Sequence, residues 1–385
     1  MATQVEAVVD FCRELVRLRS LPGQEGEVAE AVQARMCALN YDRVVVDGWG
    51  NVIGTIVGGR AEAGSPRILL DAHMDTVPPG DSDNWQHDPF GAKVEQGRIY
   101  GRGAVDDKAS VAAIVSMVPL LNRDRLAGTV YVCASVHEEV AEGAALAKVV
   151  EAVRPDFVVV CEPTELKLGI GQKGRAGVRV EATGVASHSS RPSDGVNAVY
   201  KMLPAMQRLR SVETRVDPLL GEEIVELVEL ISTPYPSTAI VPYHCLARYD
   251  CRLVRQEPVA KLLARLQTAA GEDVSTSIQR RTITCYTGAQ IEVEEYYPAW
   301  TTAPDAPFVV AARRGVQSAG HSGEDCYVPY CTNASYTAGV AHIPTILYGP
   351  GSVRHAHILD EYVEISQLAA ATEGYAAIVS ATLAG

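Results

Sequence analysis

Apolar residues follow helix-like and strand-like spacings in turn along the first 160 residues. Residues 5–18 place valine, cysteine and leucine on one helix face, and residues 67–71 form a short apolar run typical of a buried strand. Further helices are predicted at residues 108–121 and 143–153, and strands at residues 129–136 and 156–161. Apolar strands that alternate with helices predict a mainly parallel sheet, whose ligand sites lie at the carboxyl ends of its strands.

The pattern changes in the middle of the chain. Its expected elements are a strand at 177–183, a helix at 197–209, strands at 222–230 and 246–253, a helix at 258–270 and a strand at 277–287. This β-α-β-β-α-β order is typical of a ferredoxin-like α+β domain.

The α/β pattern returns after Pro298, with a strand at 343–348 and a closing helix at 364–383. We therefore predict a discontinuous α/β domain of residues 1–176 and 299–385. An α+β domain of residues 177–298 is inserted into it, and about 120 residues is an ordinary size for a domain.

Composition restricts the classes of function. Of the 385 residues, 47% are hydrophobic and 21% are charged, as in an ordinary globular protein. No apolar run approaches membrane-spanning length and no signal pattern opens the chain, so we expect a cytoplasmic protein. The nine cysteines form no Cys-x-x-Cys pair, which favours reduced thiols. A net charge of −13 disfavours nucleic acid or an anionic membrane as partner.

Candidate chemistry comes from polar residues that follow predicted strands or a glycine turn. They are two imidazoles and three carboxylates: His73, Asp106, Glu139, Glu162 and His357. This set suits two divalent ions of borderline hardness, zinc above all, with cobalt or manganese as alternatives. Beside it stands a further carboxylate, Glu138, which could take the proton of a water activated by the metal.

The motifs that carry these residues, in this order, resemble the M20 family of metallopeptidases and deacylases. They read Asp71-Ala-His-Met-Asp75, Gly101-Arg-Gly-Ala-Val-Asp106, His137-Glu-Glu139, Cys161-Glu-Pro163 and Ala356-His-Ile-Leu-Asp-Glu361. The family includes acetylornithine deacetylase, succinyl-diaminopimelate desuccinylase and glutamate carboxypeptidase. The resemblance spans nearly the whole chain and implies a zinc-exopeptidase-like catalytic domain with an inserted lid and dimerisation domain.

One branch of that family is the most similar, the selenium-metabolism-associated hydrolases. The similarity lies in Cys161-Glu-Pro-Thr164, Gly171-Gln-Lys-Gly-Arg175 and Asn197-Ala-Val-Tyr-Lys201. The name of the branch describes an association and fixes no substrate.

The resemblance also implies a role for each ligand. Asp106 bridges the two metals, His73 and Glu162 complete one site, and Glu139 and His357 complete the other. Asp75 holds the imidazole of His73 through its second nitrogen.

Two positions have a neighbour of the same type. Asp107 could replace Asp106, although the spacing from Gly101-Arg-Gly103 favours Asp106. His355 lies close to His357, but the family motif matches His357. We therefore expect His355 to lie in support of the site or on its substrate side.

Three further residues have expected roles in catalysis. Glu138 matches the family's general base, which would also protonate the leaving amine. His188, in a motif similar to the family's lid motif, would reach the active site of the partner subunit and stabilise the oxyanion. Arg252 matches a residue that holds a substrate carboxylate, and an ordinary ion pair in the lid is an equal alternative. Ala239 stands where many relatives have an asparagine that contacts substrate, so those contacts do not transfer.

These observations predict a metal-dependent hydrolase that cleaves an amide bond of a small N-acyl amino acid or dipeptide-like substrate. A dipeptidase or carboxypeptidase of the same family is the alternative, and a carbamoyl or ring-amide hydrolase would need the same metal core. A non-catalytic metal-binding regulatory protein is disfavoured, because Glu138 and all five ligands are present. A homodimer through the lid domain is expected, since relatives pair the edges of the lid sheets.

Overall fold

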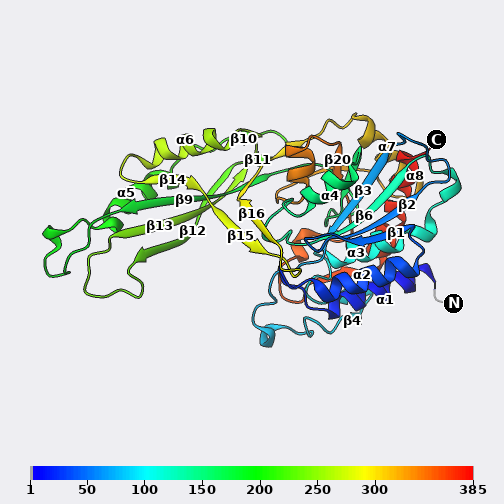
Figure 1. The fold of residues 1–385 in the computed structure, drawn as a ribbon, viewed down its shortest axis with the longest axis horizontal. Helices are drawn as coiled ribbons and strands as arrows, with labels where there is room; N and C mark the ends of the chain where they lie inside the picture. Colours follow the sequence, from blue (N-terminus) through cyan, green and yellow to red (C-terminus); the bar gives the residue numbers. More distant parts are fainter. Residues whose placement is uncertain (1–2, 385) are drawn as a thin grey trace.

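The chain folds into two lobes that lie side by side along the long axis of the molecule (Figure 1). The computed structural model describes residues 3–384. The larger lobe is built from the first and last parts of the described residues, and the smaller lobe is built from their middle part. Each lobe has a sheet and a hydrophobic core of its own.

A nine-stranded mixed sheet forms the centre of the larger lobe. Four neighbouring strands run parallel: β6 (Thr129–Ser135), β3 (Arg67–His73), β7 (Phe157–Val160) and β20 (Thr345–Leu347). The edges are β1 (Arg43–Val46) and β2 (Val52–Val57) on one side, and β8 (Leu168–Gln172), β18 (Trp300–Thr301) and β19 (Asp325–Val328) on the other. The predicted α/β class with a mainly parallel sheet is confirmed.

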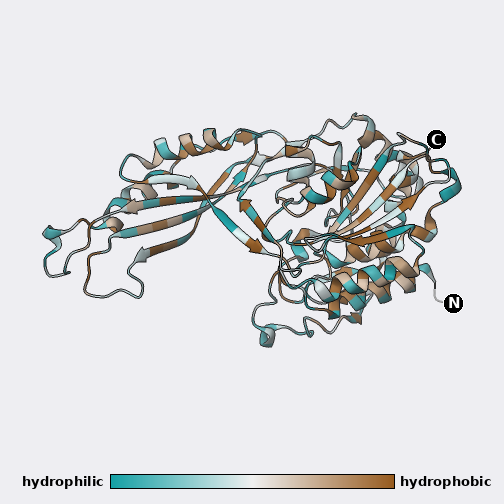
Figure 2. Cartoon of the chain, viewed as in Figure 1, coloured by the Kyte–Doolittle hydropathy of each residue, from teal (hydrophilic) through white to brown (hydrophobic). Residues whose placement is uncertain are grey.

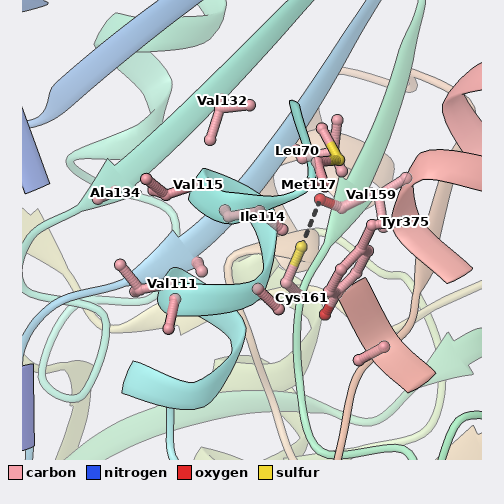
Figure 3. Packing of buried hydrophobic residues seen from close by; sticks show 14 of the residues in the cluster. Leu70, Val111, Ile114, Val115, Met117, Val132, Ala134, Val159, Cys161 and Tyr375 are labelled. Carbon is pink, nitrogen blue, oxygen red and sulfur yellow. Dashed lines mark hydrogen bonds between the residues drawn. The ribbon is translucent and has the colours of Figure 1, made fainter. Parts of the chain in front are cut away.

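Helices cover both faces of this sheet, which explains why its strands are continuously apolar. One face carries α1 (Gln4–Arg17), α2 (Gly26–Ala38), α3 (Lys108–Ser116), α7 (Pro307–Ser318) and α8 (Ile365–Thr382), and the other carries α4 (Leu146–Val153). Successive residues of a strand point to opposite faces. Leu70 of β3 therefore packs with α3, and Leu69 packs with α4. Figure 3 shows α3 packed against strand residues such as Leu70 and Val132.

The smaller lobe has the expected β-α-β-β-α-β order. Its elements are β9 (Gly174–Thr183), α5 (Ala198–Arg210), β12 (Ile224–Thr233), β13 (His244–Leu253), α6 (Val259–Ala270) and β14 (Ser275–Ile278). The antiparallel sheet has the order β12-β13-β9-β14, and α5 and α6 share its core. Only one face is covered by helices, so buried and half-buried residues alternate along β13. Figure 2 shows this alternation of hydrophilic and hydrophobic residues along the strands of the smaller lobe.

The prediction of a single strand at residues 277–287 is wrong. The chain instead forms β14 and then a separate hairpin of β15 (Arg280–Thr284) and β16 (Gln290–Glu294). Ile283 of β15 and Ile291 and Val293 of β16 are buried and belong to the core of the larger lobe. The inserted segment therefore reaches back to the larger lobe before the α/β pattern resumes.

Several elements were not predicted, and some bounds differ. The sequence analysis did not predict the edge strands β1 and β2 or the helices α2 and α7. It also did not predict a small sheet of β4 (Lys93–Glu95), β5 (Arg98–Tyr100) and β21 (Tyr362–Glu364). α3 ends at Ser116 rather than at residue 121, because the chain turns into a short 3-10 helix around Pro119. Within residues 3–384, no helix has the length and apolar character needed to cross a membrane.

Candidate metal centre

The fold brings the five predicted ligands to one edge of the central sheet. His73 is the last residue of β3, Glu139 follows β6, and Glu162 follows β7. Asp106 lies in the glycine turn before α3, and His357 lies in the loop before β21. Because parallel strands end at the same edge, residues far apart in sequence meet there.

Asp106 lies between the two imidazoles. Its Oδ1 atom is 2.9 Å from Nε2 of His73, and its Oδ2 atom is 3.2 Å from Nε2 of His357. His357 also lies 3.1 Å from a carboxylate oxygen of Glu139. Each oxygen of Asp106 thus faces a different imidazole, as a carboxylate shared by two metal sites would.

Two overlapping groups of side chains have the geometry to hold an ion. One comprises His73, Asp106 and Glu139, and the other comprises His73, Glu138 and Glu162, with the ligand atoms of each group within 4.8 Å of one another. Imidazole and carboxylate ligands of this kind suit zinc and similar divalent ions. The donor set therefore fits a pair of divalent metals.

The electrostatics of the cluster favour added positive charge. Burial raises the pKa of Glu138 well above its ordinary value, and the neighbouring Glu142 and Glu139 raise it further against the opposing effect of His73. Burial likewise raises the pKa of Glu162. Hydrogen bonds to Asp106 and Glu139 raise the pKa of His357 to about 10. Glu138 and Glu162 thus hold protons tightly, whereas, against the effect of its burial, the two imidazoles lower the pKa of Asp106. A divalent cation would satisfy the negative potential that raises the pKa of the two glutamates.

Asp107 and His355 were the alternatives to Asp106 and His357 as ligands, and their side chains contact other groups. A carboxylate oxygen of Asp107 accepts the backbone N–H of His73 at 3.1 Å, so this side chain faces the main chain of β3. The Nε2 atom of His355 lies 3.0 Å from the hydroxyl of Tyr362, and the two rings stack. The contacts to both imidazoles are made by Asp106.

Asp75 supports the cluster mainly through its contacts with the main chain. Its two carboxylate oxygens accept the backbone N–H groups of Glu138 at 3.0 Å and of Glu139 at 3.1 Å. The second ring nitrogen of His73 lies 2.9 Å from the backbone carbonyl of Asp75 and 3.5 Å from its carboxylate. Asp75 therefore links β3 to the segment that carries the two glutamates.

Glu361 and Arg102 form a support that the sequence did not reveal. One oxygen of Glu361 accepts the backbone N–H groups of Val105 and Asp106, and the other lies 2.5 Å from a guanidinium nitrogen of Arg102. The side chains of Glu361 and Arg102 are both buried. Both residues stand in motifs already identified, since Arg102 belongs to the Gly-Arg-Gly turn and Glu361 ends the motif of His357. Their positions in these motifs could have indicated this contact.

A cavity of about 380 Å³ opens onto the cluster. Arg252 from the smaller lobe lines it, with Nε 3.0 Å from a carboxylate oxygen of Asp250. A larger cavity of about 950 Å³ lies at the junction of the lobes. Its lining includes one carboxylate, Asp217, and one imidazole, His342, too few for a comparable metal site.

His188 lies apart from the metal centre of its own chain. It follows β9 in an exposed loop, and its Nδ1 atom lies 2.7 Å from the hydroxyl of Ser190. Arg175 near the start of β9 lines the metal cavity, and Thr183 ends the strand eight residues further on. At ~3.3 Å per residue this separates the loop from the cavity by roughly 26 Å along the strand. Figure 1 shows the loop after β9 at the end of the smaller lobe remote from the larger lobe.

Comparison with known proteins gives a consistent result. The model of peptidase family M20/M25/M40 matches residues 69–381. An Escherichia coli protein named YgeY, described as uncharacterized, is 30% identical over 387 residues, covering 97% of this chain and 94% of its own length. The acetylornithine deacetylase of Aliivibrio fischeri is 29% identical over 317 residues, covering 79% of this chain and 78% of its own.

A solved structure shows the same fold. The YXEP protein of Bacillus subtilis, a dinuclear metal-binding peptidase, superimposes with a TM-score of 0.68 at 17% identity. The match covers 99% of this chain and 98% of that protein.

Proposed function

This chain belongs to peptidase family M20/M25/M40, the hydrolases of amide bonds, and on that premise we propose that it cleaves a small N-acyl amino acid or dipeptide-like substrate with the help of two divalent metals. The observation that carries this proposal is the position of Asp106 between His73 and His357, with Glu139 and Glu162 beside them. Support for two metals also comes from the YXEP protein of the same fold.

The proposed metal assignment is the one that the resemblance to the family implies. Asp106 would be shared, His73 and Glu162 would hold one ion, and Glu139 and His357 would hold the other. When bound, zinc or a similar ion would supply a water of lowered pKa and would polarise the carbonyl of the substrate.

Glu138 is proposed as the general base. It is buried beside the cluster, 3.9 Å from His73, and its Oε1 atom has no hydrogen-bond partner among the described residues. Asp75 fixes its backbone. Glu138 would take the proton of the attacking water and return it to the leaving amine.

We further propose a homodimer formed by the smaller lobes. β12 is an edge strand of the lobe's sheet, and exposed edges are usually paired or protected. Large apolar side chains are exposed on this lobe, among them Tyr200, Leu203, Val228 and Leu230. In such a dimer His188 of the partner subunit would donate a hydrogen bond to the oxyanion, since His188 lies far from its own cavity.

The proposed partners are therefore a small amide substrate and a second copy of the chain. Nucleic acid and membrane are not expected, given the net charge of −13. All nine cysteines are free, which fits a reducing compartment, and we propose that the enzyme acts in the cytoplasm.

A substrate screen tests the proposal. Protein loaded with zinc, cobalt or manganese would be assayed against N-acetyl, N-succinyl and N-carbamoyl amino acids and against dipeptides. We expect hydrolysis of at least one class, lost on exhaustive chelation and restored by metal. Activity that persists after elemental analysis shows no metal would contradict the proposal.

A further inference from the structure

A buried carboxylate in the metal cavity has a free oxygen that the proposed chemistry does not use. Glu142 is 7% exposed and lines the same cavity as Glu138 and Arg252. Its Oε1 atom lies 2.5 Å from a guanidinium nitrogen of Arg175. Its Oε2 atom is buried and has no hydrogen-bond partner among residues 3–384. Leaving a buried carboxylate oxygen unpaired is costly, so an external donor is expected there.

Glu142 is the first member of a chain of ion pairs along one cavity wall. Nε of Arg175 lies 3.3 Å from one oxygen of Asp250, and Nε of Arg252 lies 3.0 Å from the other. Arg175 also lies 4.0 Å from Glu295, which pairs with Arg281 at 2.9 Å. The network therefore holds three carboxylates and three guanidinium groups, and its charges balance. Arg175 already has Asp250 as a partner, so an ion pair with Glu142 alone does not explain why Glu142 is buried here.

Arg252 pairs with Asp250, the alternative that the sequence left open for it, and the resemblance to the family also implies that it holds a substrate carboxylate. The charge balance changes when Arg252 takes that second role. The charge of Arg252 is then shared with the substrate, and Glu142, Arg175 and Asp250 retain a net charge of −1. A cationic group on the same substrate would neutralise it. The free oxygen of Glu142 is where such a group could also donate a hydrogen bond.

We propose that Glu142 binds the ammonium group of a zwitterionic substrate, a small dipeptide-like molecule with a free amine and a free carboxylate. This deepens the proposed function and rests on it. A cavity of about 380 Å³ lies at the small end of the roughly 300–1,000 Å³ typical of small-molecule sites, which suits a ligand of this size. An N-acylated amine carries no charge and cannot form an ion pair with Glu142. N-acyl substrates should therefore be cleaved less efficiently than substrates with a free amine.

Matched substrate pairs test this on the wild-type, metal-loaded protein. Each pair is a dipeptide and its N-acetyl derivative, with the same scissile bond. We expect kcat/KM to be at least about tenfold higher for the free amine, the lower end for a hydrogen bond to a charged group. The preference should fall as pH rises past about 8, where the amine of the dipeptide loses its proton.

The variant Glu142→Gln keeps the shape of the side chain but removes its charge. We expect kcat/KM for free dipeptides to fall at least about tenfold and that for N-acetyl dipeptides to change much less. Glu151→Gln is the matched control, because Glu151 is exposed on α4 and forms an ion pair with Lys148, away from the metal cavity. Calorimetric titration with a non-hydrolysable zwitterionic dipeptide analogue gives a second readout, in which Kd should rise at least about tenfold with metal content unchanged.

The outcomes separate the two proposals. If N-acetyl dipeptides or N-acyl amino acids are cleaved as well as free dipeptides, and Glu142→Gln affects both alike, the role of Glu142 is wrong while the amide hydrolase stands. If no amide of any class is cleaved by the metal-loaded protein, the proposed function itself is wrong. The comparison on wild-type protein needs no variant, so a folding defect in Glu142→Gln cannot mask the result.

Discussion

The Nε2 atom of His357 lies 3.2 Å from Oδ2 of Asp106, although 250 residues separate the two in sequence. The contact joins the two sequence segments of the larger lobe, because the smaller lobe is inserted between these residues. Glu361, four residues after His357, also binds the backbone of Asp106 and fixes the distance from the other side. The metal centre is therefore assembled only when the discontinuous larger lobe has closed.

Replacing Asp106 should remove metal from both sites. Asp106→Asn offers one carbonyl oxygen where the carboxylate faced two imidazoles, so we expect metal content to fall from about two ions per chain to fewer than one. Elemental analysis after dialysis measures this. A variant that retains both ions would show that Asp106 is not shared.

Glu138 and Glu139 should behave differently although they are adjacent. Glu138→Gln should leave metal content nearly intact and reduce kcat by at least about 10²-fold, because it removes the base. Glu139→Gln should instead weaken metal binding, since Glu139 contacts His357. Metal content and turnover measured on both variants show which glutamate is the base and which is the ligand. Loss of metal in Glu138→Gln, with loss of turnover alone in Glu139→Gln, would mean that the two roles are exchanged.

The strand ends made most of the metal centre predictable. His73, Glu139 and Glu162 follow apolar runs, and a parallel sheet brings such positions to one edge. The wall formed by Glu142 and Arg175 was not predictable, because β9 comes from the other lobe and its packing against the larger lobe leaves no periodic signal. The hairpin of β15 and β16 was missed for a related reason, since β15 has a single apolar residue, Ile283, which gives no strand pattern of its own.

Glu25 should make the stability of the fold depend on pH. Burial, and then the charge of Asp75, raise its pKa from 4.5 to about 7 in the folded protein. The folded state therefore binds this proton more tightly than the unfolded state. The resulting stabilisation is fully present below pH 4.5 and is lost as pH rises through 7, by up to about 3 kcal/mol.

Glu25→Gln removes this titration and keeps an acceptor for the backbone N–H groups of Gly23 and His137. We expect the Tm of the variant relative to wild type to be higher at pH 8 than at pH 5. Thermal unfolding of metal-free protein at both values measures it. Glu30→Gln, an exposed change on α2, serves as control. A Tm difference that does not change with pH would contradict the role of Glu25.

His188 provides the test of assembly. It lies in the loop beyond the far end of β9, roughly 26 Å along the strand from Arg175 in the cavity, so we expect it to act on the partner's site. His188→Ala and Glu138→Ala should each be nearly inactive as homodimers. After subunit exchange, a mixed dimer has one site in which the Glu138 of one subunit meets the His188 of the other. With random exchange and independent sites, activity should recover to about a quarter of wild type.

Exchange is verified with a mass-tagged subunit. Verified exchange without recovery would mean that His188 serves its own subunit or has no part in catalysis.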